Sequence, residues 1–504
     1  MITMDDSSMS LLRVSIFLLF SKCVLSEPFK IYTNDVEDLR ASSFPKRFIF
    51  GTGSSAYQVE GAWNEGGKGE SIWDRIIHTT PSYIQDNSSA DVACDSYHRY
   101  KEDIKLIKKT GFSMYRISIS WPRVLPNGTN DYINSEGLQH YRNVLNELAR
   151  YNIEPMVTLY HWDLPQALQD MGGWMNETIV EHFQNYARVI FETLGNQVKW
   201  WGTINEPKQI ARGYSSHNYA PSLGLNGVGD YIAGHNILKA HAKVYRMYEK
   251  EFKPTQKGKI SLGLSGNFLL PKTDSEEDAR AAEQGMQFSL GWFGHPVYSS
   301  TGDYPPVMRD IIDRNSLREG RNQSRLPYFT LEEIEEIKGS YDYFSCNHYT
   351  TFLGTFGESG LDPSNERDRN VLLDVNPKWP ASNCTWLKVY PEGFRKMISW
   401  IKAHYGEHIP IAITENGYCD DERLNDFGRV SYYDSYLKEL LKAIVEDGAN
   451  VVAYLAWSFL DNFEWRGGYM RRFGLYHVNF SDPQRPRKRK LSAEYWERFL
   501  LQRA

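Results

Sequence analysis

An apolar, strand-like run that ends in polar or aromatic residues and is followed by a helical pattern recurs eight times along the chain. The eight runs are 48–53, 114–118, 154–160, 199–205, 260–265, 343–347, 411–414 and 451–457. Between them, 137–151 and 432–447 place apolar side chains on one helical face. Because strands that alternate with helices pair in parallel, eight such units predict an α/β fold, a single (β/α)8 TIM barrel.

The chain is longer than a barrel needs. It has 504 residues, whereas a simple barrel takes about 250. The surplus falls after strand ends, in 207–258, 268–340 and 350–395, so long βα loops are expected to build a deep pocket on one face. A doubly wound sheet is the alternative, but 51–61 (GTGSSAYQVEG) lacks the GxGxxG phosphate turn of that fold.

The N-terminus resembles a secretory signal. A short apolar run at 14–20 follows Arg13 and precedes a possible cleavage site after Ser26. A buried N-terminal helix is the alternative. The residues before Met9 are acidic, whereas a signal peptide begins with positive charge, so both Met1 and Met9 stay open as the first residue. We therefore predict a signal peptide at 1–26, a barrel domain at 27–504, and a secreted or luminal protein without a membrane span. Six glycosylation sequons agree with that route: Asn87, Asn127, Asn176, Asn322, Asn383 and Asn479.

Charge and cysteine content narrow the function. Lys and Arg total 57 against 63 Asp and Glu, a net charge of −6, so no broad cationic field favours nucleic acid. The basic run 485–490 is interpreted as a solvated loop rather than a nuclear signal. Cys94, Cys346, Cys384 and Cys419 permit three complete pairings into two bridges, but for a chain of this size we expect zero or one bridge. Their spacing predicts no metal site.

Two glutamates stand at the ends of predicted strands. Glu206 follows 199–205, and Glu415 follows 411–414, each next to an asparagine. Carboxylates at the carboxyl ends of barrel strands point into the catalytic mouth. Adjacent residues of a regular strand face opposite sides, so Asn205 and Glu206 can both face the pocket only if the strand breaks there, as Pro207 makes plausible.

Paired carboxylates suit glycoside hydrolysis. At a separation of about 5–5.5 Å, one attacks the anomeric carbon while the other protonates the leaving group, with retention of configuration. The charge of the first raises the pKa of the second and keeps it protonated. Once the first is esterified by sugar, that pKa falls, and the second carboxylate becomes the base that activates water. No organic cofactor or metal is then required.

The motifs around these glutamates, TINEP at 203–207 and ITENG at 413–417, resemble those of glycoside hydrolase family 1, the retaining β-glucosidases and their relatives. The resemblance runs from Phe44 to about Trp496. Supporting motifs appear in order: FIFGTGSSAYQVEG at 48–61, YRISISWPRVLP at 115–126, YHWDLP at 160–165, NHYT at 347–350 and WSFLDNFEWRGGYMRRFGL at 457–475.

The resemblance implies a role for each matching residue. Glu206 would be the acid/base and Glu415 the nucleophile, held and oriented by Arg116 and Tyr349. The residues that would bind the sugar are Gln58, His161, Asn205, Asn347, Trp457, Glu464 and Trp465. Polar side chains around a tryptophan plane match the hydroxyl rim and C–H faces of a sugar. For His161 and the two tryptophans, ordinary core packing is the alternative.

The sequence predicts hydrolysis of β-D-glucosides, with galactosides and fucosides left open. A carboxylate at Glu464 would repel a 6-phosphate. In the family that the chain resembles, the loop after the acid/base motif helps to line the leaving-group site, and here it carries Lys208 and Arg212. Two cations there would favour an anionic leaving group such as a glucosinolate, unless they are solvated surface charges or form internal salt bridges. The alternatives are therefore a thioglucosidase that keeps both glutamates and, more remotely, a klotho-like binding module that has lost catalysis.

Overall fold

A computed structural model describes residues 39–502. The predicted signal peptide, 1–26, lies outside this range and stays a prediction. From Ala41 onward the chain forms one compact unit. No helix of the described part is long and apolar enough to cross a membrane.

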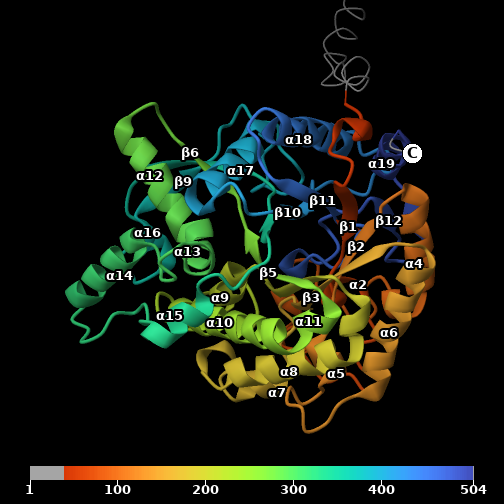
Figure 1. Ribbon diagram of the computed structural model, residues 1–504, viewed down its shortest axis with the longest axis horizontal. Helices are drawn as coiled ribbons and strands as arrows, with labels where there is room; N and C mark the ends of the chain where they lie inside the picture. The colour runs from red at the N-terminus through yellow and green to blue at the C-terminus, as the bar shows by residue number, and fades with distance from the viewer. Residues whose placement is uncertain (1–38, 503–504) are drawn as a thin grey trace, which may run out of the picture. The chain divides into compact units, whose positions relative to one another are not determined.

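Eight parallel strands close into a barrel in the order β1-β11-β10-β7-β5-β4-β3-β2 (Figure 1). They are β1 (Ile49–Gly53), β2 (Met114–Ser118), β3 (Glu154–Tyr160), β4 (Trp200–Asn205), β5 (Lys259–Ser265), β7 (Phe344–Asn347), β10 (Ile411–Asn416) and β11 (Val451–Trp457). The predicted barrel is confirmed. Each strand lies within two residues of its predicted bounds.

Helices alternate with these strands and surround the barrel (Figure 1). The main ones are α4 (Ser96–Thr110), α6 (Ser135–Arg150), α8 (Ile179–Leu194), α10 (Gly229–Met247), α13 (Trp292–Tyr298), α17 (Pro391–Tyr405), α18 (Phe427–Val445) and α19 (Leu491–Leu501). The Asn134 side chain caps α6 by accepting from the Glu136 amide at 3.2 Å. The apolar residues that predicted this helix are all buried: Leu138, Tyr141, Val144, Leu145 and Leu148.

The extra length forms structure of its own after β5 and β7. A three-stranded sheet contains β6 (Phe268–Pro271), β8 (Thr351–Phe356) and β9 (Val371–Asp374). It lies with α12 (Glu276–Met286), α14 (Pro306–Arg318) and α16 (Asn365–Arg369) at one side of the barrel (Figure 1). The segment 207–258 differs from the expected loop, because the barrel helix α10 occupies much of it.

Short elements complete the described chain. The helical ones are η2 (Ala41–Ser43), α2 (Ala56–Val59), α3 (Ile72–Thr79), η3 (Pro81–Tyr83), α5 (Trp121–Val124), α7 (Gln166–Asp170), η4 (Gly173–Met175), η5 (Gly195–Gln197), α9 (Pro207–Ser215), η6 (Tyr248–Phe252), α11 (Lys253–Gln256), η7 (Gln287–Gly291), α15 (Leu331–Ile337) and η8 (Trp465–Gly467). Strands β12 (Tyr476–Val478) and β13 (Arg487–Arg489) form a separate antiparallel pair.

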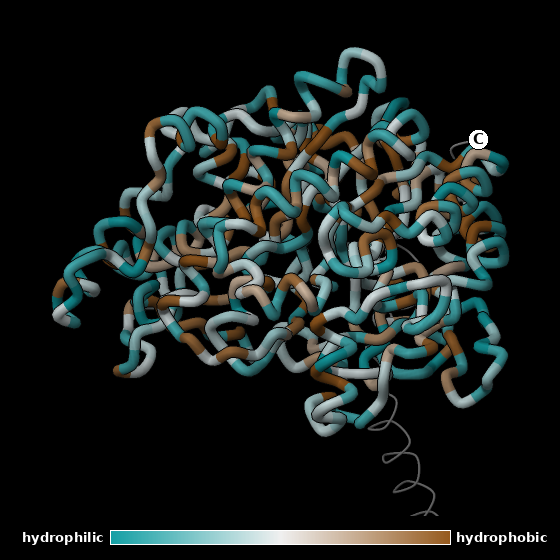
Figure 2. The backbone as a smooth tube through the Cα atoms, turned by 90° about the horizontal axis from the view of Figure 1, so that it is seen from below, coloured by the Kyte–Doolittle hydropathy of each residue, from teal (hydrophilic) through white to brown (hydrophobic). Residues whose placement is uncertain are grey.

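A hydrophobic cluster fills the barrel interior. Its members come from different strands or strand entrances: Met114, Met156, Trp200, Tyr343, Ala412, Ala453 and Leu455. Hydrophobic segments gather inside the fold, while hydrophilic ones follow the outer loops (Figure 2). Because packed side chains close the barrel from within, the carboxyl ends of the strands are left to form the open mouth.

One disulfide forms in the described chain. Cys384 and Cys419 are bonded, with their Cα atoms 5.6 Å apart. Cys94 and Cys346 are buried free thiols. Among the described residues, the expectation of zero or one bridge is met by the Cys384–Cys419 bond. The bridge ties the segment between β9 and α17 to the segment that follows β10.

The interpretation of 485–490 as a solvated loop is wrong in part, because Lys488 and Arg489 are exposed but the run contains a strand and buried cations. Its middle residues form β13, paired with β12. Arg487 bonds to Asp103 at 2.7 Å, and Lys490 pairs with Asp461 at 2.6 Å with both side chains fully buried. The sequence pattern marks five basic residues and a proline as exposed, but it does not reveal carboxylates that come from distant parts of the chain.

Removal of the Lys490 ammonium is expected to destabilise the fold. The change Lys490→Ala leaves the Asp461 carboxylate buried without its 2.6 Å partner, and breaking a buried pair in this way costs about 3–5 kcal/mol. Urea unfolding measures the loss as a lower midpoint. Lys488 is exposed two residues earlier, in β13, so Lys488→Ala is the matched control and should change stability by less than about 0.5 kcal/mol. Equal midpoints for the two variants would contradict the expectation.

Candidate active site

A cavity of about 610 Å³ opens at the carboxyl ends of the barrel strands. Ten of the eleven side chains that the sequence assigned to catalysis or sugar binding line it: Gln58, His161, Asn205, Glu206, Asn347, Tyr349, Glu415, Trp457, Glu464 and Trp465. The eleventh, Arg116, lies behind the wall and is 3% exposed. The structure therefore brings the predicted set together at one place.

Glu206 reaches the cavity because the chain turns sharply after β4. The strand ends at Asn205, Glu206 adopts a left-handed conformation with φ 45° and ψ 66°, and Pro207 begins α9. The pairing of β4 with β5 is also irregular after Gly202. The regular alternation of a strand is therefore broken, and both Asn205 and Glu206 face the cavity.

Glu415 is held by two donors. Arg116 Nη1 donates to its Oε1 at 2.5 Å, and the Tyr349 hydroxyl donates to its Oε2 at 2.6 Å. Strand β10, which carries Glu415, shifts register against β7 between Ile413 and Glu415. Both carboxylate oxygens are thus fixed, and the guanidinium compensates the negative charge.

Two asparagines connect the glutamates. Arg116 Nη2 donates to Asn205 Oδ1 at 2.6 Å. Asn347 Nδ2 donates to the same oxygen at 3.1 Å and to Glu206 Oε1 at 2.9 Å. A continuous hydrogen-bonded chain therefore runs from Glu415 through Arg116, Asn205 and Asn347 to Glu206, and it fixes the two carboxyl groups relative to each other.

Burial sets the protonation of Glu206. Loss of water, and after it the charge of Glu415, together raise the pKa of this carboxyl group to about 8. The Asn347 amide and Arg116 oppose the shift. The carboxyl group of Glu206 therefore carries a proton at neutral pH and can act as a general acid.

Gln58 and Glu464 form another wall. Gln58 Nε2 donates to Glu464 Oε2 at 3.1 Å and to Asn462 Oδ1 at 2.9 Å. Burial, with a smaller contribution from the charge of Glu415, raises the pKa of Glu464 to about 8 although Arg471 opposes the shift. The sequence argument against 6-phosphoglycosides relied on repulsion of the phosphate by a charged Glu464. A protonated Glu464 carries no charge and gives no such repulsion, so exclusion of a 6-phosphate stays a prediction with a weaker physical basis.

Aromatic rings line the cavity beside His161. This ring stacks on Trp457 at 5.9 Å and on Trp465 at 6.0 Å. His161 Nε2 accepts from the Asn205 amide at 3.1 Å, and Nδ1 has no partner in the described chain. Burial lowers the His161 pKa, which keeps the ring neutral. The Nδ1–H is therefore a buried donor without a partner in the described chain, unlike that of a satisfied core histidine.

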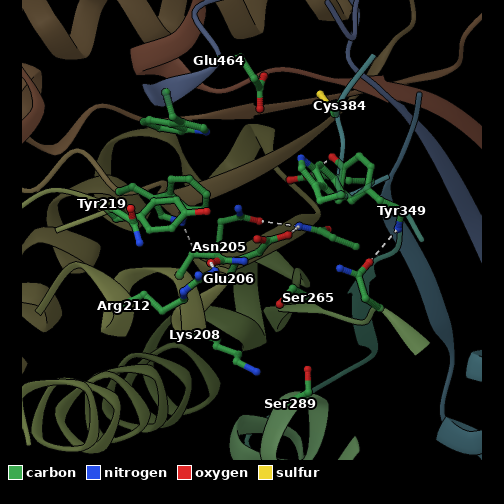
Figure 3. Close-up of a pocket in the computed structure, with 18 of the residues that line it drawn as sticks. Asn205, Glu206, Lys208, Arg212, Tyr219, Ser265, Ser289, Tyr349, Cys384 and Glu464 are labelled. Carbon is green, nitrogen blue, oxygen red and sulfur yellow. Dashed lines mark hydrogen bonds between the residues drawn. The ribbon is translucent and has the colours of Figure 1, made fainter. Parts of the chain in front are cut away.

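Lys208 and Arg212 lie in the cavity, so their interpretation as surface charges is wrong. Both line its wall, and neither forms an ion pair with a side chain of residues 39–502. Figure 3 shows them on the opposite side of the Asn205–Glu206 pair from Glu464. The cavity thus has a cationic end on the side of Glu206 away from Glu464.

Several lining residues were not identified from the sequence. They include Trp162, Asn267, Arg369, Trp386 and Arg471. Trp162 belongs to the YHWDLP motif, and the position of that motif at a strand end could have identified it as a lining residue. Arg369 and Trp386 lie in 350–395, the segment whose extra length was expected to deepen the pocket, but nothing in their local pattern marks them. The described residues contain no cluster of side chains suited to a metal ion.

The family model of glycosyl hydrolase family 1 matches residues 40–503. The chain belongs to this family. It is 49% identical to Myrosinase 1 of Brevicoryne brassicae over 456 residues, which cover 90% of this chain and 97% of that protein. It is 40% identical to the cytosolic beta-glucosidase of Cavia porcellus, over 91% of this chain and 98% of that protein.

Solved structures of family 1 agree with the fold. An aphid myrosinase superposes with a TM-score of 0.88 at 48% identity, covering 91% of this chain and 99% of that one. The protein is a glycoside hydrolase of the β-glucosidase type.

Proposed function

We propose that this protein is a retaining β-glucosidase, with Glu415 as nucleophile and Glu206 as acid/base. The main support for the proposal is the hydrogen-bonded chain between the two carboxyl groups, because it places them in different electrostatic surroundings. Glu415 has a guanidinium against one oxygen, whereas burial and the charge of Glu415 raise the pKa of Glu206 to about 8. One group is suited to attack and the other to give a proton.

The reaction then proceeds in two displacements. Glu415 attacks the anomeric carbon, and the bond to the leaving group breaks as Glu206 delivers its proton to the departing oxygen. Esterification removes the Glu415 charge, which lowers the Glu206 pKa, since that charge is one of its causes. Glu206 next takes a proton from water, and the hydroxide attacks the same carbon and frees Glu415.

The remaining predicted residues would bind the glucose ring. The His161 Nδ1–H and the Gln58, Asn205, Asn347 and Glu464 side chains offer donors and acceptors for its hydroxyls. The indole of Trp457 would form the apolar floor, and that of Trp465 would lie at the outer hydroxyls. Arg116 and Tyr349 act on Glu415 rather than on the sugar, as their contacts with both of its oxygens support.

Hydrolysis of 4-nitrophenyl β-D-glucoside tests the proposal directly. Proton NMR of the first product formed distinguishes β-glucose, which retention gives, from α-glucose. The Glu415→Gln variant controls for a contaminating glycosidase. Absence of activity on any β-glycoside would reject catalysis and revive the klotho-like alternative.

A thioglucosidase is the second candidate. The similarity to Myrosinase 1 and the two unpaired cations, Lys208 and Arg212, in the cavity favour it, because a glucosinolate leaves with an anionic sulfate. Sinigrin hydrolysis measured beside the O-glucoside separates the candidates. Glucose release from sinigrin at a rate that rivals the O-glucoside supports the thioglucosidase, and no release rejects it.

We also propose that the protein is secreted as a glycoprotein after cleavage near Ser26, leaving 27–504 as its catalytic domain. The sequons at Asn87, Asn127, Asn322 and Asn383 are exposed, and those at Asn176 and Asn479 are half-buried. N-terminal sequencing of protein from the medium of expressing insect cells tests the cleavage. A mass decrease after amidase removal of N-glycans tests the modification, and retention in the cells without glycans would reject both.

The acid role of Glu206 predicts an alkaline limit. Because the group must be protonated to act and its pKa is about 8, kcat/KM for a β-glucoside should fall as the pH rises through that value. A profile of kcat/KM against pH measures this limb. With 2,4-dinitrophenyl β-D-glucoside, whose leaving group needs no proton, the limb should be absent. The same limb for both substrates would assign it to another group.

A further inference from the structure

Three cations gather at the end of the cavity beyond Glu206. Lys208, Arg212 and Arg369 all line it, and none has a carboxylate within ion-pair distance in residues 39–502. Glu366 is the acidic side chain beside them. The arrangement therefore carries an excess of positive charge within a partly desolvated wall.

The protein gives these cations few partners. Lys208 Nζ donates to the Phe288 carbonyl at 3.4 Å, and Arg212 Nη1 donates to Gln209 Oε1 at 3.1 Å. Arg369 is 9% exposed and uses its Nε for the Val371 carbonyl at 3.1 Å. Both Nη groups of Arg369 are left without a hydrogen bond to the described chain.

The cations also act on one another. Burial lowers the Lys208 pKa to about 7, and Arg369 and then Arg212 add to that effect, opposed by Glu366. Buried like charges repel and are retained at a cost in stability unless an opposite charge joins them. An anion at this place would relieve the repulsion and find free guanidinium donors, which bind oxyanions in a bidentate fashion.

Asp368, which precedes Arg369 in the sequence, determines where Arg369 lies. Asp368 is fully buried and receives both Nη groups of Arg325 at 2.7 Å. The Tyr231 hydroxyl, from α10, donates to it at 2.7 Å, and Asn315 Nδ2, from α14, at 2.9 Å. This four-donor clamp around Asp368 fixes α16 and so holds Arg369 at the cavity.

We propose that Arg369, positioned by the clamp around Asp368, completes with Lys208 and Arg212 a subsite for a carboxylate or sulfate on the leaving group. This inference rests on the proposed glycosidase function. Lys208 is two residues from Glu206, and both cations labelled in Figure 3 lie away from Glu464, so the subsite belongs to the leaving group rather than to the glucose. The same chemistry would also accept a free oxyanion, which the experiment distinguishes.

A matched pair of substrates isolates the charge. The β-D-glucoside of 4-hydroxybenzoate carries a carboxylate, and that of its methyl ester is neutral. For Arg369→Gln, we expect kcat/KM to fall roughly 10- to 100-fold on the acid, mainly through KM. The fall on the ester should be much smaller. Arg369→Lys should recover part of the loss, because a charge returns without the planar fork.

The outcomes separate the possible failures. Equal falls on acid and ester would overturn the subsite. A second outcome concerns inhibition by sodium sulfate. If sulfate inhibits hydrolysis of both substrates equally in the wild type but does not inhibit Arg369→Gln, the site binds a free anion and the leaving-group assignment is overturned. If the wild type hydrolyses neither substrate, the glycosidase proposal itself fails, which is a different result.

The positioning role of Asp368 is tested separately. Asp368→Asn should lower the acid-to-ester ratio of kcat/KM in the same direction as Arg369→Gln. If that variant does not fold, Tyr231→Phe removes a single donor from the clamp and should lower the ratio less. Asp310 is exposed on the neighbouring α14, so Asp310→Asn is the matched control with an unchanged ratio. An unchanged ratio in folded clamp variants would overturn the positioning role.

Discussion

Glu415→Gly is expected to lower kcat by on the order of 10⁴-fold or more, because removal of a covalent nucleophile eliminates the intermediate. The change also opens space beside the anomeric carbon, next to the Arg116 guanidinium and the Tyr349 hydroxyl that Glu415 had occupied. Azide is small and anionic, so it should enter this space and attack the sugar in place of the carboxylate. The product should be α-glucosyl azide, which proton NMR identifies.

The stereochemistry of that product provides the control. Glu206→Gly opens space on the opposite face of the sugar, so azide should attack the glycosyl-enzyme there and yield β-glucosyl azide. The reverse pattern, β from Glu415→Gly and α from Glu206→Gly, would exchange the two proposed roles. Because Arg116 loses its ion-pair partner in Glu415→Gly, thermal unfolding should be compared with Glu415→Gln, which keeps an oxygen near the guanidinium.

The barrel was predictable because its signal is local. Each strand is a short apolar run with a polar end, and the bounds of β2, β3 and β11 agree with prediction to the residue. The position of Glu206 was predictable for the same reason, since carboxyl ends of parallel strands meet at one mouth. The sequence predicted, from Pro207, that the strand breaks at Glu206. It did not predict the left-handed backbone conformation of Glu206.

Features that depend on distant partners were not predictable. Lys490 lies in a run that looks solvated, and only the fold places Asp461 against it. Arg369 belongs to a long loop segment without periodicity, and its place depends on Asp368, Arg325 and α10, which are far apart in the sequence. Burial is likewise a property of the assembled site, so the raised pKa of Glu464 corrected a charge argument made from residue type alone.

Glu206→Gln is expected to discriminate among substrates by their leaving groups. A glutamine keeps the size of the side chain and an oxygen that can accept from Asn347 Nδ2, as Glu206 Oε1 does at 2.9 Å. It cannot deliver a proton. For a phenyl glucoside with a basic leaving group, kcat/KM should therefore fall about 10²- to 10⁴-fold, the usual contribution of general acid catalysis.

Substrates that need no proton should be spared in the first step. Formation of the glycosyl-enzyme from 2,4-dinitrophenyl β-D-glucoside, measured as a burst of dinitrophenol, should change little, while turnover slows because water has lost its base. Azide should restore turnover. Sinigrin, whose leaving group also needs little protonation, should lose less kcat/KM than the basic phenyl glucoside. A uniform loss across all three substrates would mean that Glu206 supports the site structurally and does not transfer the proton.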